Sequence, residues 1–168
     1  QTKETKTDKK HAPVRPHLQQ LNKLKRTIIK ASATHGATAC GSQERPNKFG
    51  FVISGILRLY YTNDSGDEFN KSFCIETDLV AAYSALLQNR ASRLSIQALE
   101  KATLLVIGYK DYLKLLNQHM CWQILGRRIA ENLFIKKEEK ESQFLLDSTE
   151  TRYLKFLKEY PDLEVRIK

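Results

Sequence analysis

The sequence predicts an α+β fold in which an antiparallel double-stranded β-helix (a jelly roll) is flanked by helices. The stretch Phe51–Tyr61 contains two β-rich runs that meet at Gly55, and its second run alternates residue by residue, which is typical of a strand. Several short strands follow one another with tight connections and without an intervening long helix. This order favours an antiparallel sandwich or jelly roll over a parallel sheet. A long helical pattern then begins at Met120.

The N-terminal part is basic and polar. Residues 1–30 contain nine of the 28 lysines and arginines but two of the 19 aspartates and glutamates, so the rest of the chain is close to neutral. Residues 1–16 are therefore interpreted as a basic disordered tail, for which a solvated tail is favoured over a DNA contact. Pro16 opens a short helix that carries Leu18, Leu21 and Leu24 on one face.

A strand is expected at Arg26–Ala31, and the small, polar segment Ser32–Lys48 is expected to be a long loop. Gly55 marks a bend or a close approach of another backbone. The turn Asn63–Gly66 then connects the central run to a returning strand, and together they form a hairpin. The remaining expected elements are a strand at Glu68–Ile75, one or two helical turns within Leu79–Leu87, and strands at Arg93–Leu99 and Ala102–Gly108 joined by a turn at Glu100–Lys101.

The C-terminal part is predicted to be helical. A helix at Lys110–Gln118 precedes the long helix, whose apolar stripe is longer than one small roll needs and indicates a partner helix. A core helix within one chain is the rival interpretation. Asp147 is expected to cap a last helix, with Glu150 completing a capping box, before Pro161 ends it. The stripe of the long helix consists of Trp122, Leu125, Ile129 and Leu133, and that of the last helix of Tyr153, Leu154, Leu157 and Tyr160.

Composition narrows the class of protein. The apolar runs are too short for a membrane span, and the N-terminus lacks the apolar stretch of a signal peptide. The three cysteines are widely separated, which predicts free thiols in a reducing compartment and hence a cytoplasmic protein. No membrane partner is expected.

The order of elements, and several stretches within it, resemble the Crp/Fnr family of transcription regulators, with a cyclic-nucleotide-binding-like sensor domain. The stretches are Phe51–Tyr61, the turn ending in Gly66, Ser95–Glu100 and Leu145–Leu154. The resemblance covers roughly residues 18–166. It implies that residues 17–119 form the β-roll, 120–146 a long dimerisation helix, and 147–168 the start of a truncated DNA-binding domain.

The resemblance also implies a ligand pocket at the inserted short helix and the strand after it. There, helix N–H groups and an arginine bind a cyclic phosphate, and a glutamate accepts from the ribose hydroxyl. Ala82 stands where that glutamate is expected, and Ser92 stands at the arginine position with Arg93 one place late. Cyclic AMP is therefore expected to bind weakly or not at all, because the loss of two charged partners is severe. The pocket candidates are Ala81, Ala82, Tyr83, Ser84, Arg90, Ser92 and Arg93.

The expected function is the effector-sensing and dimerisation part of such a regulator, with itself and an unknown small-molecule effector as partners. DNA would be contacted only through a C-terminal domain that is missing here, because a winged helix-turn-helix needs further helices. The alternative is a stand-alone cyclic-nucleotide-binding-like scaffold or interaction module without DNA binding. A coding sequence that continues past Lys168 into a helix-turn-helix would favour the first interpretation.

Enzymatic chemistry is not expected. A cupin-like metal site needs histidines projecting from strands, whereas the four histidines lie outside the predicted strands. An iron–sulfur sensor needs four cysteine ligands, and neither a phosphate-binding glycine loop nor a nucleophile elbow is present. The sequence therefore predicts no catalytic residue, no metal site and no cofactor.

Overall fold

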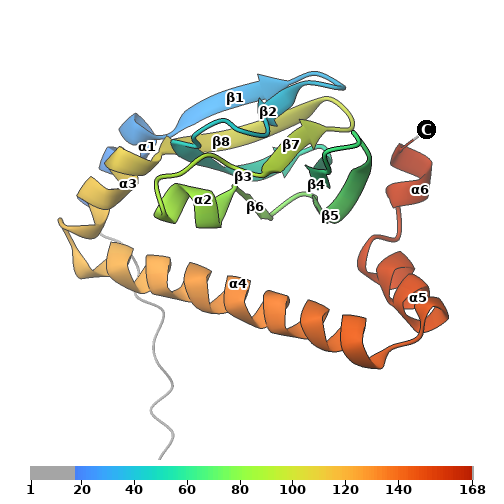
Figure 1. Ribbon diagram of the computed structural model, residues 1–168. Coiled ribbons are helices and arrows are strands. Elements are labelled where there is room, and N and C mark those ends of the chain that lie inside the picture. Colours follow the sequence, from blue (N-terminus) through green and yellow to red (C-terminus); the bar gives the residue numbers. More distant parts are fainter. Residues whose placement is uncertain (1–17, 168) are drawn as a thin grey trace, which may run out of the picture.

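The computed structural model describes residues 18–167, which form two four-stranded antiparallel sheets packed face to face (Figure 1). The strand order is β1-β8-β3-β6 in one sheet and β2-β7-β4-β5 in the other. This jelly-roll sandwich with flanking helices confirms the predicted fold class. The strands are β1 (Ile29–Ala33), β2 (Thr38–Cys40), β3 (Lys48–Ser54), β4 (Leu57–Thr62), β5 (Glu68–Cys74), β6 (Leu79–Val80), β7 (Leu94–Ala98) and β8 (Ala102–Gly108).

The helices lie at the ends and along one side of the roll. Figure 1 shows α4 running alongside the roll, and α5 and α6 turning back toward β5. Their bounds are α1 (Leu18–Thr27), α2 (Tyr83–Leu87), α3 (Tyr109–Leu116), α4 (Met120–Leu146), α5 (Thr149–Glu159) and α6 (Leu163–Arg166). The predicted tail of residues 1–16 lies outside the described residues, and the predicted domain boundaries stay predictions.

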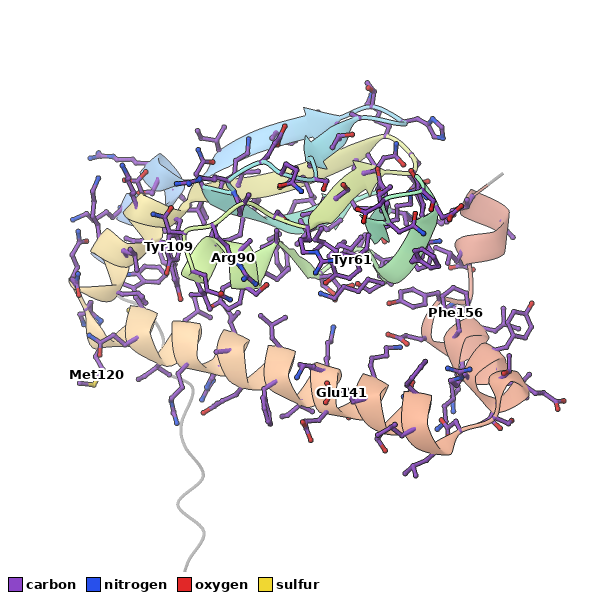
Figure 2. The ribbon with its side chains drawn as sticks, viewed as in Figure 1. Tyr61, Arg90, Tyr109, Met120, Glu141 and Phe156 are labelled. Atoms are coloured by element: carbon purple, nitrogen blue, oxygen red, sulfur yellow. The ribbon has the colours of Figure 1, made fainter. Side chains whose placement is uncertain are left out.

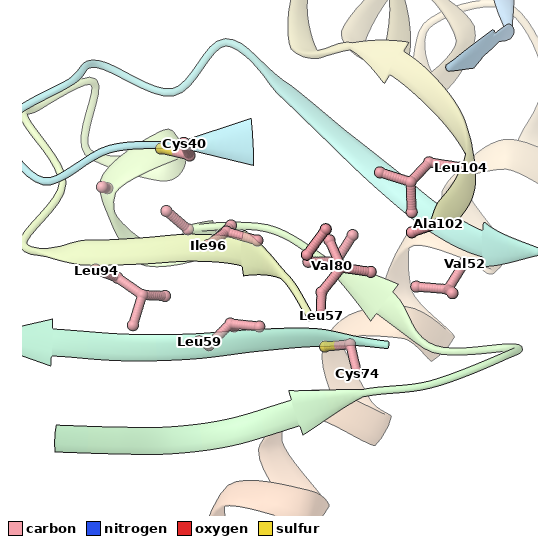
Figure 3. Packing of buried hydrophobic residues seen from close by; sticks show 13 residues of the cluster. Cys40, Val52, Leu57, Leu59, Cys74, Val80, Leu94, Ile96, Ala102 and Leu104 are labelled. Carbon is pink, nitrogen blue, oxygen red and sulfur yellow. The ribbon is translucent and has the colours of Figure 1, made fainter. Parts of the chain in front are cut away.

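The main core fills the space between the two sheets (Figure 3). Alternate residues of β7 point into it, so that Leu94, Ile96 and Ala98 are all buried, as their spacing predicts. Val52 and Leu57, on either side of Gly55, are completely buried. The same interior therefore holds the two sheets together and forms the walls of the site described below.

Gly55 combines both features that its position predicts. Its φ is +98°, and a Cβ atom there would lie 2.5 Å from Cα of Ala102. Both the left-handed backbone and the close approach of another strand exclude a side chain. The chain can therefore cross from β3 in one sheet to β4 in the other at this residue.

Two elements differ from the expected ones near the N-terminus. The strand expected at Arg26–Ala31 begins at Ile29, because α1 continues through Thr27. The segment Ser32–Lys48 is not one long loop, since it contains the end of β1 and the strand β2. Thr38 of β2 pairs with Gln97 of β7, so this short strand depends on a partner that is distant in sequence.

The segment Leu79–Leu87 is also more divided than expected. Its first two residues form β6, which pairs with Gly50 and Phe51 of β3, and the single helix α2 begins only at Tyr83. The apolar sequence of this segment is compatible with a helix or a strand. Leu79 and Val80 form a strand because they pair with β3. Residues 81 and 82 are left as a short connection between β6 and α2.

The N-cap of α5 is not the predicted residue. Ser148, rather than Asp147, is the N-cap of α5, because its Oγ accepts a hydrogen bond from the Thr151 amide at 3.2 Å. Asp147 instead ends α4 and forms an ion pair with Lys155 at 2.6 Å. The buried side of α5 also differs, since Phe156 and Tyr160 pack against the roll while Tyr153 and Leu154 are exposed.

Candidate functional site

A cavity of about 350 Å³ lies between the two sheets. Its inner surface is apolar and comes from strands of both sheets, including Ile96 of β7 and Leu104 of β8. The connection between β6 and α2 forms one wall, and the connection between β2 and β3 forms another. The lining residues are Ala39, Cys40, Glu44, Arg45, Pro46, Asn47, Lys48, Phe49, Gly50, Val80, Ala81, Ala82, Ile96, Leu104 and Val106.

Only part of the predicted pocket set lines this cavity. Ala81 and Ala82 do, and Ala82 is almost fully buried, so the position expected to hold a ribose acceptor presents a methyl group. Tyr83 and Ser84 start α2 outside the lining, and Tyr83 is half-buried. Figure 2 shows Arg90 beside α2 on the side of the roll that faces α4, where it is exposed.

The other two predicted pocket residues, Ser92 and Arg93, do not line the cavity. Ser92 is buried, and its Oγ donates to the Leu94 carbonyl at 2.8 Å and accepts from the Leu94 amide at 2.9 Å. Its backbone amide donates to the Glu44 carbonyl, and its carbonyl accepts from the Gln43 amide. Ser92 therefore fastens the β2–β3 connection to the start of β7. Arg93 is exposed and does not line the cavity.

The charged residues at the cavity come from the segment Ser32–Lys48, which the sequence predicts to be a long loop. Glu44, Arg45 and Lys48 lie in or next to the β2–β3 connection, and all three are exposed at its edge. Their only signal in the sequence is a charged cluster directly before a predicted strand. That signal does not say which cavity the cluster borders, because its position depends on the pairing of β2 with β7.

Cys40 is the one thiol in the lining. Burial, reinforced by the nearby carboxylate of Glu44, raises the pKa of the Cys40 thiol above its ordinary value. The neutral thiol is a weak nucleophile and contributes a small apolar surface. The cavity is thus suited to binding rather than to covalent chemistry.

Within residues 18–167, no group of three or more metal-ligating side chains is close enough together to hold an ion. None of the helices in this part of the chain is long and apolar enough to cross a membrane.

The predicted dimer stripe is divided between two environments. Trp122 is buried in a second core cluster with Ile107, Leu115 and Cys121, so it supports the contact of α3 and α4 with the roll. Leu125 is 45% exposed, and Ile129 and Leu133 are half-buried.

The same face of α4 continues toward its C-terminal end. Lys136 follows Leu133 at three residues and Lys140 follows at four more, so both share the stripe's face. Lys136 reaches Asp78 of the roll, and Lys140 forms an ion pair with Glu159 of α5. The stripe therefore lies on the roll-facing side of α4 but is only partly covered there.

A family comparison matches the part of the chain that encloses the cavity. Residues 32–119 match the family described as the cyclic nucleotide-binding domain. The chain belongs to that family. The matched range begins in β1 and ends after α3, so it includes the end of β1, the strands β2 to β8 and the whole cavity lining.

Solved structures with the fold of this cyclic nucleotide-binding domain include transcription regulators. The catabolite activator protein of Thermus thermophilus aligns with a TM-score of 0.61 at 20% identity, over 74% of this chain and 59% of that one. A Crp/Fnr-family regulator from Eubacterium rectale aligns with a TM-score of 0.70 at 18% identity, over 89% and 69%. These likenesses show that the chain has the fold of these Crp/Fnr-type regulators, and it spans less than two thirds of the Thermus protein.

A third solved structure with this fold is also a bacterial regulator. The regulator CLP of Xanthomonas campestris, described as responsive to c-di-GMP, aligns with a TM-score of 0.66 at 12% identity, over 88% of this chain and 72% of that one. No curated protein sequence matches this chain.

Proposed function

We propose that this chain is the effector-sensing and dimerisation part of a Crp/Fnr-like transcription regulator. The observation that carries the proposal is the cavity between the sheets of a cyclic nucleotide-binding domain. Its volume of about 350 Å³ and apolar interior are typical of a pocket for a small molecule. DNA would be bound by a part of the regulator beyond this chain.

The lining favours an effector other than a cyclic nucleotide. Ala82 offers no acceptor for a ribose hydroxyl, and both bonds of the Ser92 hydroxyl are already used within the protein. The interior consists mainly of apolar side chains. At its edge, Arg45 and Lys48 add positive charge beside Glu44, whose carboxylate accepts a hydrogen bond from the Gly41 amide. We infer that the effector has an apolar body and an acidic group, because such a molecule matches both regions.

Calorimetric titration with decanoate, decanol and cyclic AMP tests this assignment on the intact chain. Decanoate and decanol share an apolar body and differ in charge, so the difference between them reports the cationic edge of the cavity. We expect saturable binding of decanoate with one site per chain, weaker binding of decanol, and no binding of cyclic AMP up to millimolar concentration.

Two variants assign the binding to the cavity. Ala82→Leu fills the interior and should abolish binding of both aliphatic probes, while Arg45→Gln should weaken decanoate about tenfold and leave decanol unchanged. Arg93→Gln removes an exposed arginine outside the lining and is the matched control. Micromolar affinity for cyclic AMP, or decanoate binding that survives Ala82→Leu, would contradict the proposal.

The dimer is proposed from the partly covered stripe of α4. Leu125, Ile129 and Leu133 keep apolar surface accessible on the face of α4 that looks toward the roll. A second copy of α4 crossing at a shallow angle would bury these side chains, and two-fold pairing is the commonest arrangement of soluble homo-oligomers. A regulator that binds a palindromic operator also needs two DNA-binding units at a fixed spacing.

A further inference from the structure

The C-terminal helices α5 and α6 dock against one end of the roll (Figure 1). A third core cluster joins the two parts, in which Ile56 of the roll has no exposed surface and Tyr160 and Leu163 cover it. Phe156 extends from α5 toward β5 (Figure 2), and its ring centroid lies 5.8 Å from that of Phe73. The contact is therefore specific packing rather than a loose approach of two helices.

One arginine supplies most of the polar contacts at this junction. The guanidinium of Arg166 donates to both carboxylate oxygens of Glu76, at 2.8 and 3.1 Å, and also pairs with Glu100. Glu76 in turn accepts the Gly55 amide at 2.9 Å. The Tyr160 hydroxyl donates to the Phe73 carbonyl at 3.2 Å.

These roll residues belong to three separate connections at the same end of the sandwich. Gly55 and Ile56 connect β3 with β4, Glu76 lies between β5 and β6, and Glu100 lies in the turn between β7 and β8. Without Arg166, the two carboxylates would face each other without a shared cation. The roll is thus complementary to α6 in charge as well as in shape.

The contacts that hold α5 and α6 on the roll are weak enough to open. The side chains of Arg166, Glu76 and Glu100 are 29–39% exposed, so solvent screens their ion pairs and each contributes little to stability. The apolar part rests on two buried residues of this segment, Tyr160 and Leu163, and α5 has no buried residue within its own range. Segments held by few buried contacts open at lower free energy than the core does.

The connection that carries Glu76 also continues into the cavity wall. Asp78, two residues later, pairs with Lys136 of α4 at 2.9 Å, and its carboxylate accepts the Ile75 amide at 3.1 Å. The chain then enters β6, where Val80 begins the wall that Ala81 and Ala82 complete. A ligand that displaces this wall acts on the same short segment that holds both α4 and α6.

We propose that residues 148–167 form a releasable latch, clamped to the roll by Arg166 between Glu76 and Glu100, and that filling the cavity releases it through the segment Glu76–Ala82. The structure represents the docked state. The coupling to the cavity rests on the proposed effector site, whereas the latch itself does not. A ligand can then shift the free-energy difference between the docked and undocked states only by the difference between its binding free energies for those two states.

Hydrogen exchange of the full chain, followed by mass spectrometry, tests the latch. Arg166→Glu places a third carboxylate between the other two and should raise the exchange rate across α5 and α6 by at least about tenfold, with the protection of β3, β7 and β8 unchanged. Glu76→Gln keeps an acceptor for the Gly55 amide and should give a smaller increase in α6. Lys158→Glu makes the same charge reversal at an exposed position of α5 and should behave like the unmodified chain.

Two results would overturn the latch. Unchanged exchange in α5 and α6 of Arg166→Glu would show that the clamp does not hold them. A parallel loss of protection in β3, β7 and β8, in Arg166→Glu and Glu76→Gln alike, would show that the junction is part of an indivisible core.

The coupling is tested with decanoate as the probe. Saturating decanoate should raise exchange in α5 and α6 of the unmodified chain, and Lys136→Gln should bind decanoate equally tightly in calorimetry but show a smaller response. Decanoate that binds without changing exchange contradicts the coupling. Failure of decanoate to bind contradicts the proposed effector class alone, because the Arg166→Glu result is obtained without any ligand.

Discussion

At the scale of single residues, Glu76 shows how one side chain joins two parts of the molecule. The hydrogen bonds from Arg166, followed by those from backbone amides, lower the pKa of Glu76 from its ordinary value of 4.5 to about 2. The carboxylate is therefore ionised in the docked state at any physiological pH. Its low pKa depends on α6, since Arg166 is the largest cause.

The first prediction concerns the pH dependence of this contact. Because the pKa of Glu76 is lower in the docked state than in the undocked state, its stabilising contribution is fully present above pH 4.5. It is lost as the pH falls from about 4.5 toward 2. The amide NMR signals of α6 should report undocking within this window in the unmodified chain. In Glu76→Gln the transition within the window should be smaller, and an identical titration in the two proteins would contradict the assignment.

Trp122 shows a different division of roles within one helix. Its side chain is 5% exposed and packs in the cluster that joins α3, α4 and β8, whereas Leu125, one turn later, is 45% exposed. One apolar stripe in the sequence therefore serves the fold at its N-terminal end. The accessible remainder is what a second chain can cover.

At the scale of elements, truncation of these two residues should separate the two roles. Trp122→Ala should lower the free energy of unfolding by about 3–5 kcal/mol at every protein concentration, because it leaves a cavity in the core. Leu125→Ala should leave the unfolding of the monomer nearly unchanged and weaken self-association only. Urea unfolding at two protein concentrations distinguishes these effects, and equal losses for both variants would contradict the division.

The boundaries of helices and strands depend on tertiary contacts more than the elements themselves do. The alternating pattern of Leu94–Ala98 specifies its strand locally, and the structure confirms it. Strand β2 spans only three residues and is stabilised by pairing with β7. Its own sequence is too short to show a strand pattern. Asp147 and Ser148 are both good N-cap residues by type, so the sequence alone does not distinguish them, and the backbone geometry selects Ser148.

In the whole molecule, α4 contacts α3, the roll and α5 at successive points along its length. Its N-terminal part packs against α3, Lys136 pairs with Asp78, and Lys140 pairs with Glu159 of the docked α5. A second copy of α4 on the accessible stripe would therefore contact a helix that is already connected to the cavity wall and to the latch. Dimerisation and effector binding would then both act through α4.

The dimer prediction is tested with Ile129→Asp. A carboxylate at this half-buried position would be desolvated in the interface, so sedimentation should show monomers where the unmodified chain forms dimers at high micromolar concentration. The roll should stay folded, as judged by the near-ultraviolet signal of its aromatic residues. A monomeric unmodified chain, or an Asp variant that still dimerises, would assign the stripe to the fold of one chain.

Local patterns in the sequence were sufficient to predict the sandwich, the bend or close approach at Gly55, the long helix and the family resemblance. Each depends on a local pattern, such as alternation, a glycine that cannot be replaced, or helical spacing, which a single stretch of chain carries. The absence of a carboxylate at Ala82 was equally visible, because it concerns one position in a known order of elements.

The residues that surround the cavity and the contacts of the C-terminal helices depend on how distant parts of the chain pack together. Arg45 and Lys48 reach the cavity edge because β2 pairs with β7, and Arg166 lies between Glu76 and Glu100 because α6 folds back across the roll. Arg166 is separated from Glu76 by 90 positions in the sequence and from Glu100 by 66. Side chains so far apart interact only after the sheets have packed, and no local pattern encodes such a meeting.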